Sequence, residues 1–182
     1  MALKVTKVDV WAGDLIDKPG GLADVLEQLA RGGESIDFLI ARRSDKHVKV
    51  GKVFVTPVTA PKSKDAASRA ALRRAAKLFT LRLEGGDKTG LGSKITRAIG
   101  NAGINAKGVS AAVIGNKFVA YISFDSEQDA DQAMAALKRL KVNGAPAKRA
   151  TKAGSSAKKP AMRSRSMAKK AASGGRSRAR RR

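Results

Sequence analysis

The chain contains an internal repeat, and this repeat constrains the fold more than any other feature of the sequence. The segment Asp-Lys-Pro-Gly-Gly-Leu at 17–22 returns as Asp-Lys-Thr-Gly-Leu-Gly at 87–92, an offset of 70 residues that persists to the glycines at 33 and 103. Farther on the offset falls to 65, where 51–55 resembles 116–120 and 70–74 resembles 135–139. Self-similarity of this kind is typical of a duplicated structural unit. We therefore expect two copies of one unit, with about five extra residues around 43–50 in the first.

Each copy opens with the same local pattern. Alternating apolar residues predict a strand at 5–11 and again at 78–83. After each Asp-containing loop, apolar residues at spacings of three and four predict an amphipathic helix. Gly32-Gly33 and Gly103 follow these helices, where a residue at positive φ is favoured.

The second half of each copy predicts a hairpin and another helix. The hairpins pair 36–42 with 48–55 and 104–114 with 118–124, and the second turns at Gly115-Asn116, a dipeptide suited to a two-residue turn. Apolar periodicity predicts the closing helices at 64–77 and 126–140. Ser126 and Asp129 form the start of a capping box at the second of these helices.

The predicted unit is βαββα, which indicates an α+β fold made of two tandem ferredoxin-like repeats with antiparallel sheets. A complete unit needs a fourth strand. The first copy either lacks it or shares 78–83, and the second has only 140–147 for it. We expect the two sheets to pair side by side. The predicted domains are 1–77 and 78–145, followed by a disordered tail at 146–182.

Charge sets the tail apart from the rest of the chain. The net charge is +23, and 146–182 holds 14 Lys and Arg residues and no acidic residue, which leaves 24 basic and 15 acidic residues in 1–145. Such a segment cannot bury enough apolar surface to fold. It is typical of a sequence-independent contact with DNA or RNA through phosphates. The candidate residues are Lys158, Lys159, Arg163, Arg165, Lys169, Lys170, Arg176, Arg178, Arg180, Arg181 and Arg182.

Composition excludes several classes of protein. The chain has no Cys, so disulfides and thiolate metal sites are excluded, and His47 is its single His. No apolar run reaches the roughly 18 residues of a membrane span, and the N-terminus lacks the apolar segment of a signal peptide. We find no catalytic arrangement. The expectation is a cytoplasmic protein without enzymatic activity, cofactor, metal or membrane contact; nucleoid association stays open.

The loops at Asp17 and Asp87 carry the clearest binding chemistry. A strand-to-helix turn through Gly places free backbone N–H groups and the positive end of a helix dipole beside an Asp carboxylate. The amides suit a ligand carboxylate and the Asp suits an α-amino group, so a free amino acid matches both. A plain turn and helix start would show the same residues.

With Ala102-Gly103-Ile104-Asn105 after the second helix, the Asp-Lys-Pro-Gly-Gly-Leu loop resembles the ACT domain, a small module that binds amino acids or related metabolites. The resemblance covers roughly 4–142 as two tandem copies. It implies a regulatory protein that binds an amino acid or similar small metabolite between its repeats, and it leaves a homodimer open. The implied ligand-binding residues are Asp17, Pro19, Gly20, Gly21, Leu22, Asp87, Gly90, Leu91, Ile104 and Asn105.

A second interpretation treats the chain as a nucleic-acid-binding accessory protein. Its body would then be a dimerisation scaffold or a domain like the RNA-recognition motif, which shares this order of elements and displays aromatic residues on its sheet. The strand around Tyr121 partly fits that pattern. However, Phe118, Ile122 and Phe124 alternate with Tyr121 and are expected to face the core.

Overall fold

The computed structural model describes residues 3–43 and 50–140. The predicted tail, with all of its candidate nucleic-acid contacts, lies outside the described residues, as do the residues 44–49 of the first hairpin. The helices are α1 (Gly21–Arg31), α2 (Pro61–Arg69), α3 (Leu91–Asn101) and α4 (Glu127–Lys138). The strands are β1 (Lys4–Val8), β2 (Trp11–Ile16), β3 (Phe38–Arg43), β4 (Val50–Thr56), β5 (Arg73–Arg74), β6 (Phe79–Gly86), β7 (Gly108–Ile114) and β8 (Lys117–Phe124).

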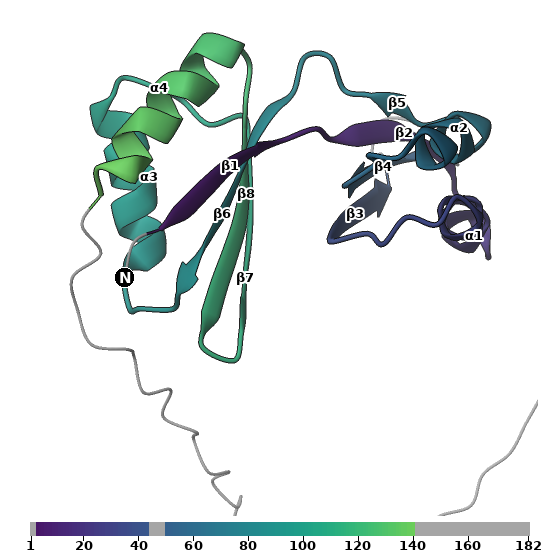
Figure 1. Cartoon of the computed structure of the whole chain (residues 1–182), viewed down its shortest axis with the longest axis horizontal. Helices are drawn as coiled ribbons and strands as arrows, with labels where there is room; N and C mark the ends of the chain where they lie inside the picture. The colour runs from purple at the N-terminus through teal and green to yellow at the C-terminus, as the bar shows by residue number, and fades with distance from the viewer. Residues whose placement is uncertain (1–2, 44–49, 141–182) are drawn as a thin grey trace, which may run out of the picture. The chain divides into compact units, whose positions relative to one another are not determined.

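The strands form two antiparallel sheets. The first-repeat sheet has the order β3-β4-β2-β5, and the second-repeat sheet has the order β1-β6-β8-β7. Helices α3 and α4 cover one face of the second-repeat sheet (Figure 1), and α1 packs with α2 in the first repeat. The predicted α+β fold of two ferredoxin-like repeats is confirmed. The expected side-by-side pairing is wrong within the described chain, because no strand of one sheet is hydrogen-bonded to a strand of the other.

The predicted first strand at 5–11 is in fact two strands that belong to different sheets. β1 pairs with β6, from Lys4 opposite Glu84 to Val8 opposite Thr80, whereas β2 pairs with β4. Hydrophobic burial explains the split, because Val5 packs in the core of the second repeat and Trp11 packs in the core of the first. The sheets therefore do not follow the division into 1–77 and 78–145.

Both repeats have a fourth strand, which settles the question that the sequence left open. In the second repeat it is β1, the N-terminal segment, whereas residues 141–147 of the predicted alternative lie outside the described residues. In the first repeat it is the short β5, which pairs with β2. The first repeat, from β2 to β5, is thus inserted between β1 and the rest of the second repeat.

The helix predicted at 64–77 is wrong in its C-terminal half. Helix α2 begins at Pro61, a residue suited to the first helical position, and ends at Arg69. Ala71 then adopts a φ of +57°, which takes the chain out of the helix. Leu72 is fully buried in the core of the first repeat. The match of 70–74 with 135–139 is therefore not structural, because the second segment belongs largely to α4.

The predicted glycine and cap positions are confirmed. Gly33 and Gly103 follow α1 and α3 with φ values of +77° and +75°. Gly115 has a φ of +62° in the two-residue turn that joins Ile114 to Lys117. At the start of α4, the Ser126 hydroxyl accepts a hydrogen bond from the backbone N–H of Asp129 at 3.0 Å.

Each repeat buries its own core between sheet and helices. The second core contains Phe118, Ile122 and Phe124 from β8, as their alternation predicted. It also contains Ile95 and Ile99 from α3, packed on the same face. The first core has the equivalent arrangement: Val25 and Leu29 of α1 pack against Val53 and Val55 of β4.

Candidate functional site

A tight bend joins β2 to α1 in the first repeat; residues 17–20 are called the Asp17 bend below. The backbone N–H of Lys18 donates to the carbonyl of Ile16 at 2.9 Å, and that of Gly21 donates to the carbonyl of Lys18 at 3.1 Å. Gly20 precedes the helix with a φ of +82°. A side chain in this conformation is strained, so the bend requires a glycine at this position.

The second repeat forms the same bend at residues 87–90, the Asp87 bend. The N–H of Leu91 donates to the carbonyl of Lys88 at 3.0 Å, and Gly90 has a φ of +80°. The N–H of Asp87 also donates to the carbonyl of Asn116 at 2.7 Å, which ties this bend to the β7–β8 turn. The repeat seen in the sequence is therefore a repeat of backbone conformation.

Each bend leaves two backbone amides free. In the described structure, no acceptor takes the N–H groups of Leu22 and Ala23 in α1, or those of Gly92 and Ser93 in α3. These groups lie at the positive end of their helix dipoles, where an anion is stabilised. Each pair of amides suits one carboxylate.

A pocket of about 220 Å³ lies beside the Asp17 bend. Arg43 at the end of β3 forms an ion pair with Asp17, with 3.1 Å between Nε and Oδ1, and the Asp17 side chain remains 34% exposed. The pocket thus combines an acid, basic groups and apolar walls. Its charged lining residues are Asp17, Lys18, Arg42 and Arg43, and its apolar ones include Leu15, Leu22 and Ala41.

Comparison with known proteins identifies the fold. No family model matches the sequence, and no curated protein matches it. Among solved structures, protein BT0572 from Bacteroides thetaiotaomicron is similar with a TM-score of 0.61 at 15% identity, over 74% of this chain and 88% of that chain. The ligand-free regulatory subunit of aspartate kinase from Thermus thermophilus is similar with a TM-score of 0.53 at 17% identity, over 75% of this chain and 93% of that chain. The body has the fold of tandem ACT repeats. At these identities the likeness shows the ACT fold alone.

The pocket beside Asp17 contains no lining residue from the Asp87 bend. It is lined only by residues of the first ACT repeat.

The predicted ligand-binding residues differ in whether they belong to a core or lie at the surface. Leu91 and Ile104 are 2% and 7% exposed and belong to the core of the second ACT repeat, so they support the Asp87 bend from beneath. Leu22 packs partly against the core of the first repeat and also borders the pocket. The remaining predicted residues differ in exposure and position. Pro19, Gly20 and Asn105 are exposed, Gly21 is buried, and Asp17, Asp87 and Gly90 lie on the bends.

A second cluster joins the two ACT repeats, and sequence reasoning missed it. The Phe38 and Tyr121 rings stack with their centroids 4.1 Å apart and their planes at 23°. The Arg82 guanidinium lies 6.0 Å from the centroid of the Tyr121 ring and donates to Asp37 at 2.6 Å. Arg82 also pairs with Glu84 at 2.5 Å. Alternation along β8 placed Tyr121 away from the core, but no local pattern pairs it with Phe38.

The electrostatics of this cluster favour charged Arg82 and neutral Tyr121. Burial acts to lower the pKa of Arg82, but Tyr121 and the carboxylates of Glu84 and Asp37 outweigh it, so the pKa is raised. Burial raises the pKa of the Tyr121 hydroxyl; Arg82 opposes the rise, and Asp37 and Glu84 add to it. Arg82 therefore stays charged and Tyr121 stays neutral near neutral pH.

The cluster also rules out the display of aromatic residues that an RNA-recognition motif needs. Tyr121 is only 6% exposed because Phe38 stacks on it. A nucleic-acid base would have to displace Phe38 before it could stack on Tyr121.

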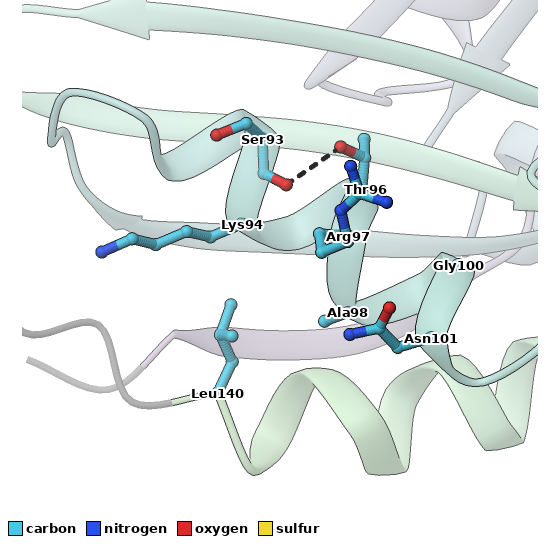
Figure 2. A pocket seen from close by; sticks show the side chains of 8 residues that line it. All are labelled: Ser93, Lys94, Thr96, Arg97, Ala98, Gly100, Asn101 and Leu140. Atoms are coloured by element: carbon cyan, nitrogen blue, oxygen red, sulfur yellow. Dashed lines mark hydrogen bonds between the residues drawn. The ribbon is translucent and has the colours of Figure 1, made fainter.

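A further hollow lies between α3 and the end of α4. Figure 2 shows Lys94, Thr96 and Arg97 along α3 and Leu140 beyond α4. Thr96 donates to the carbonyls of Gly92 and Ser93, so its hydroxyl is already engaged. The two basic side chains give the hollow a positive charge without an acid to hold an amino group.

The described residues offer neither a membrane-spanning helix nor a cluster of metal ligands. No helix among residues 3–43 and 50–140 is long and apolar enough to cross a membrane. The same residues contain no group of three or more His, Asp or Glu side chains placed to hold a metal ion.

Proposed function

We propose that the chain is a non-catalytic regulatory protein that acts in the cytoplasm and binds an amino acid or similar small metabolite at the Asp17 bend. The pocket there carries the proposal, because it offers complementary partners to both ends of a zwitterion. The free amides of Leu22 and Ala23, with Arg42 or Arg43, suit the carboxylate. Asp17 suits the α-amino group after exchanging its ion pair with Arg43.

Size and polarity support a small ligand. A pocket of about 220 Å³ holds an amino acid but not a nucleotide. Its apolar wall, formed by Leu15, Leu22 and Ala41, would contact the ligand side chain. For such binding to regulate, the ligand must favour one arrangement of the protein over another. The response would then pass to an enzyme or regulator encoded elsewhere.

A thermal-shift screen of the twenty amino acids against the full chain tests this function. We expect at least one amino acid to raise the melting temperature, and Asp17→Asn to abolish the rise. Asp87→Asn is the matched control, since it makes the same change in the bend that lacks a described pocket. If Asp87→Asn abolishes the rise as well, the site is assembled from both bends, as the sequence predicted. The absence of a shift with all twenty amino acids would refute amino-acid binding.

A second function rests on charge. The tail carries 14 of the 38 Lys and Arg residues and no acid, a composition that suits contact with a polyanion. We expect the full chain to retain duplex DNA without sequence preference. If about eight phosphates are neutralised, the logarithm of affinity should fall against the logarithm of salt concentration with a slope of about −7. A slope near zero for the salt dependence would contradict this role. Loss of retention when the base sequence of the DNA is scrambled would contradict it as well.

A further inference from the structure

The two ACT repeats border a cleft on the faces of their sheets that carry no helices; it is called the inter-sheet cleft below. Its volume is about 710 Å³, within the range of small-molecule sites. Phe38 and Ile40 of β3 and Phe54 of β4 line one side. Tyr121 and Ser123 of β8 line the other.

Strand alternation explains why these side chains are available. On β4, Val53 and Val55 are fully buried against the helices, so the residue between them, Phe54, faces the opposite side of its sheet. On β8, Ile122 and Phe124 are buried in the same way, which turns Tyr121 and Ser123 outward. The cleft is therefore built from apolar and aromatic side chains that no helix covers.

The polar groups at the floor of the cleft satisfy each other. The hydroxyls of Thr80 and Ser123 are 2.9 Å apart and hydrogen-bonded, and Thr80 is only 4% exposed. Phe38 is fixed by its stacking on Tyr121. These two hydroxyls are thus already paired, and most of the side chains around them are apolar, which favours an apolar body in the cleft over a polar one.

The charged groups around the cleft all have one sign. Its lining includes Arg42, Lys77 and Lys107 and no acidic residue. Lys107 pairs with Asp125 at 2.5 Å. Neither Arg42 nor Lys77 forms an ion pair with any described residue. Two cations without an ion-pair partner among the described residues, placed beside an apolar surface, favour a ligand that carries an anionic group.

We propose that the inter-sheet cleft binds a small amphipathic anion, a molecule with an apolar or aromatic body and one acidic group. The body would lie among Ile40, Phe54 and Phe38, and the acidic group would pair with Lys77 and Arg42. This site shares Arg42 with the Asp17 pocket, but its other lining residues and its ligand are different. Its occupation does not require amino-acid binding at the bend.

Isothermal titration of the full chain with decanoate tests the proposal. Acetate controls for charge alone, including charge bound by the tail, and decyltrimethylammonium controls for an apolar chain with the opposite charge. We expect saturable one-to-one binding of decanoate at least ten-fold tighter than that of either control. Equal binding of decanoate and acetate would overturn the proposal.

Substitutions locate the binding. Lys77→Glu should weaken the binding of decanoate about ten-fold, because it reverses the charge of one of the two cations proposed to hold the acidic group. Arg97→Glu makes the same reversal of charge on α3, outside the cleft, and should leave the affinity for decanoate unchanged. Lys77 is preferred to Arg42 because Arg42 also borders the Asp17 pocket. Equal weakening by Lys77→Glu and Arg97→Glu would refute the site.

A steric pair gives an independent readout. Ser110→Trp places a bulky ring in the cleft from β7 and should abolish binding, whereas Ala112→Trp, on the same strand and exposed, should not. In the unmodified chain, decanoate should shift the methyl NMR signals of Ile40 and not those of Ile114, which is 74% exposed. Shifts at Ile114 alone would place the anion elsewhere and refute the proposal.

Discussion

Arg82 donates a hydrogen bond from Nη1 to Oδ2 of Asp37 at 2.6 Å, and this contact joins β6 of the second ACT repeat to the residue that precedes β3 of the first. The Arg82 side chain is 28% exposed and that of Asp37 is 43% exposed, so solvent screens the pair. The same guanidinium pairs with Glu84 in its own repeat. Arg82 is therefore shared between the repeats.

A double-mutant cycle should measure this link. We expect Arg82→Gln and Asp37→Asn to couple by about 0.5–1 kcal/mol in urea unfolding, and the coupling to shrink at high salt, because the pair is partly exposed. Lys18 and Asp24, which pair at 3.2 Å within the first repeat, are the control. A coupling for Arg82 and Asp37 that does not respond to salt would contradict an electrostatic link.

The glycine of the Asp17 bend should be hard to replace. No atom lies within 4 Å of the position that a Cβ would take at Gly20, so only its φ of +82° opposes a side chain. Gly20→Ala should therefore cost about 1 kcal/mol of unfolding free energy. Gly100→Ala, inside α3 at negative φ and with open space around it, should instead stabilise by about 0.5 kcal/mol. Equal effects of the two changes in urea unfolding would show that φ is not the cause.

The N-terminal strand should stabilise the second ACT repeat. Val5 is 8% exposed and packs in that core, so Val5→Ala should cost about 2 kcal/mol. Hydrogen exchange should show faster opening of β6, the strand that β1 pairs with. Thr6→Ala, on the other face of β1, is the control. Faster exchange confined to β2 and β4 would contradict the observed pairing.

Glu34 should make stability depend on pH in the acidic range. Burial acts to raise the pKa of Glu34, but hydrogen bonds from the backbone of Thr59 and Ala60 and from the Ser63 and Thr59 hydroxyls outweigh it, so the pKa lies below its ordinary 4.5. A lowered folded pKa stabilises above the unfolded pKa, and this contribution is lost as pH falls through the folded pKa. The unmodified chain should thus lose more stability than Glu34→Gln between about pH 5 and pH 3. If urea unfolding shows that the unmodified chain and Glu34→Gln lose the same stability between these two pH values, the prediction is contradicted.

The sequence predicted the features that depend on local backbone conformation. Gly20 and Gly90 mark equivalent bends because only glycine tolerates their φ, and the Ser126 cap follows from residues three positions apart. The core faces of β4 and β8 follow from alternation, which each strand carries in its own sequence. These features need no knowledge of distant segments.

Features that depend on pairing between distant segments could not be predicted. Nothing local distinguishes a continuous strand at 5–11 from two short strands in different sheets, because Val5 and Trp11 are equally suited to either core. The stacking of Phe38 on Tyr121 depends on how two separately folded sheets meet. The pocket beside Asp17 likewise needs Arg43, which the bend's own sequence does not indicate.

The placement of β1 has a consequence for biosynthesis. A ribosome releases residues 4–8 before the rest of the body, and their partners on β6 are synthesised more than seventy residues later. All strands of the first ACT repeat are therefore synthesised before β6, the strand that pairs with β1. The sheet of the second repeat is completed only when β6 pairs with β1, a strand that was synthesised before the whole of the first repeat.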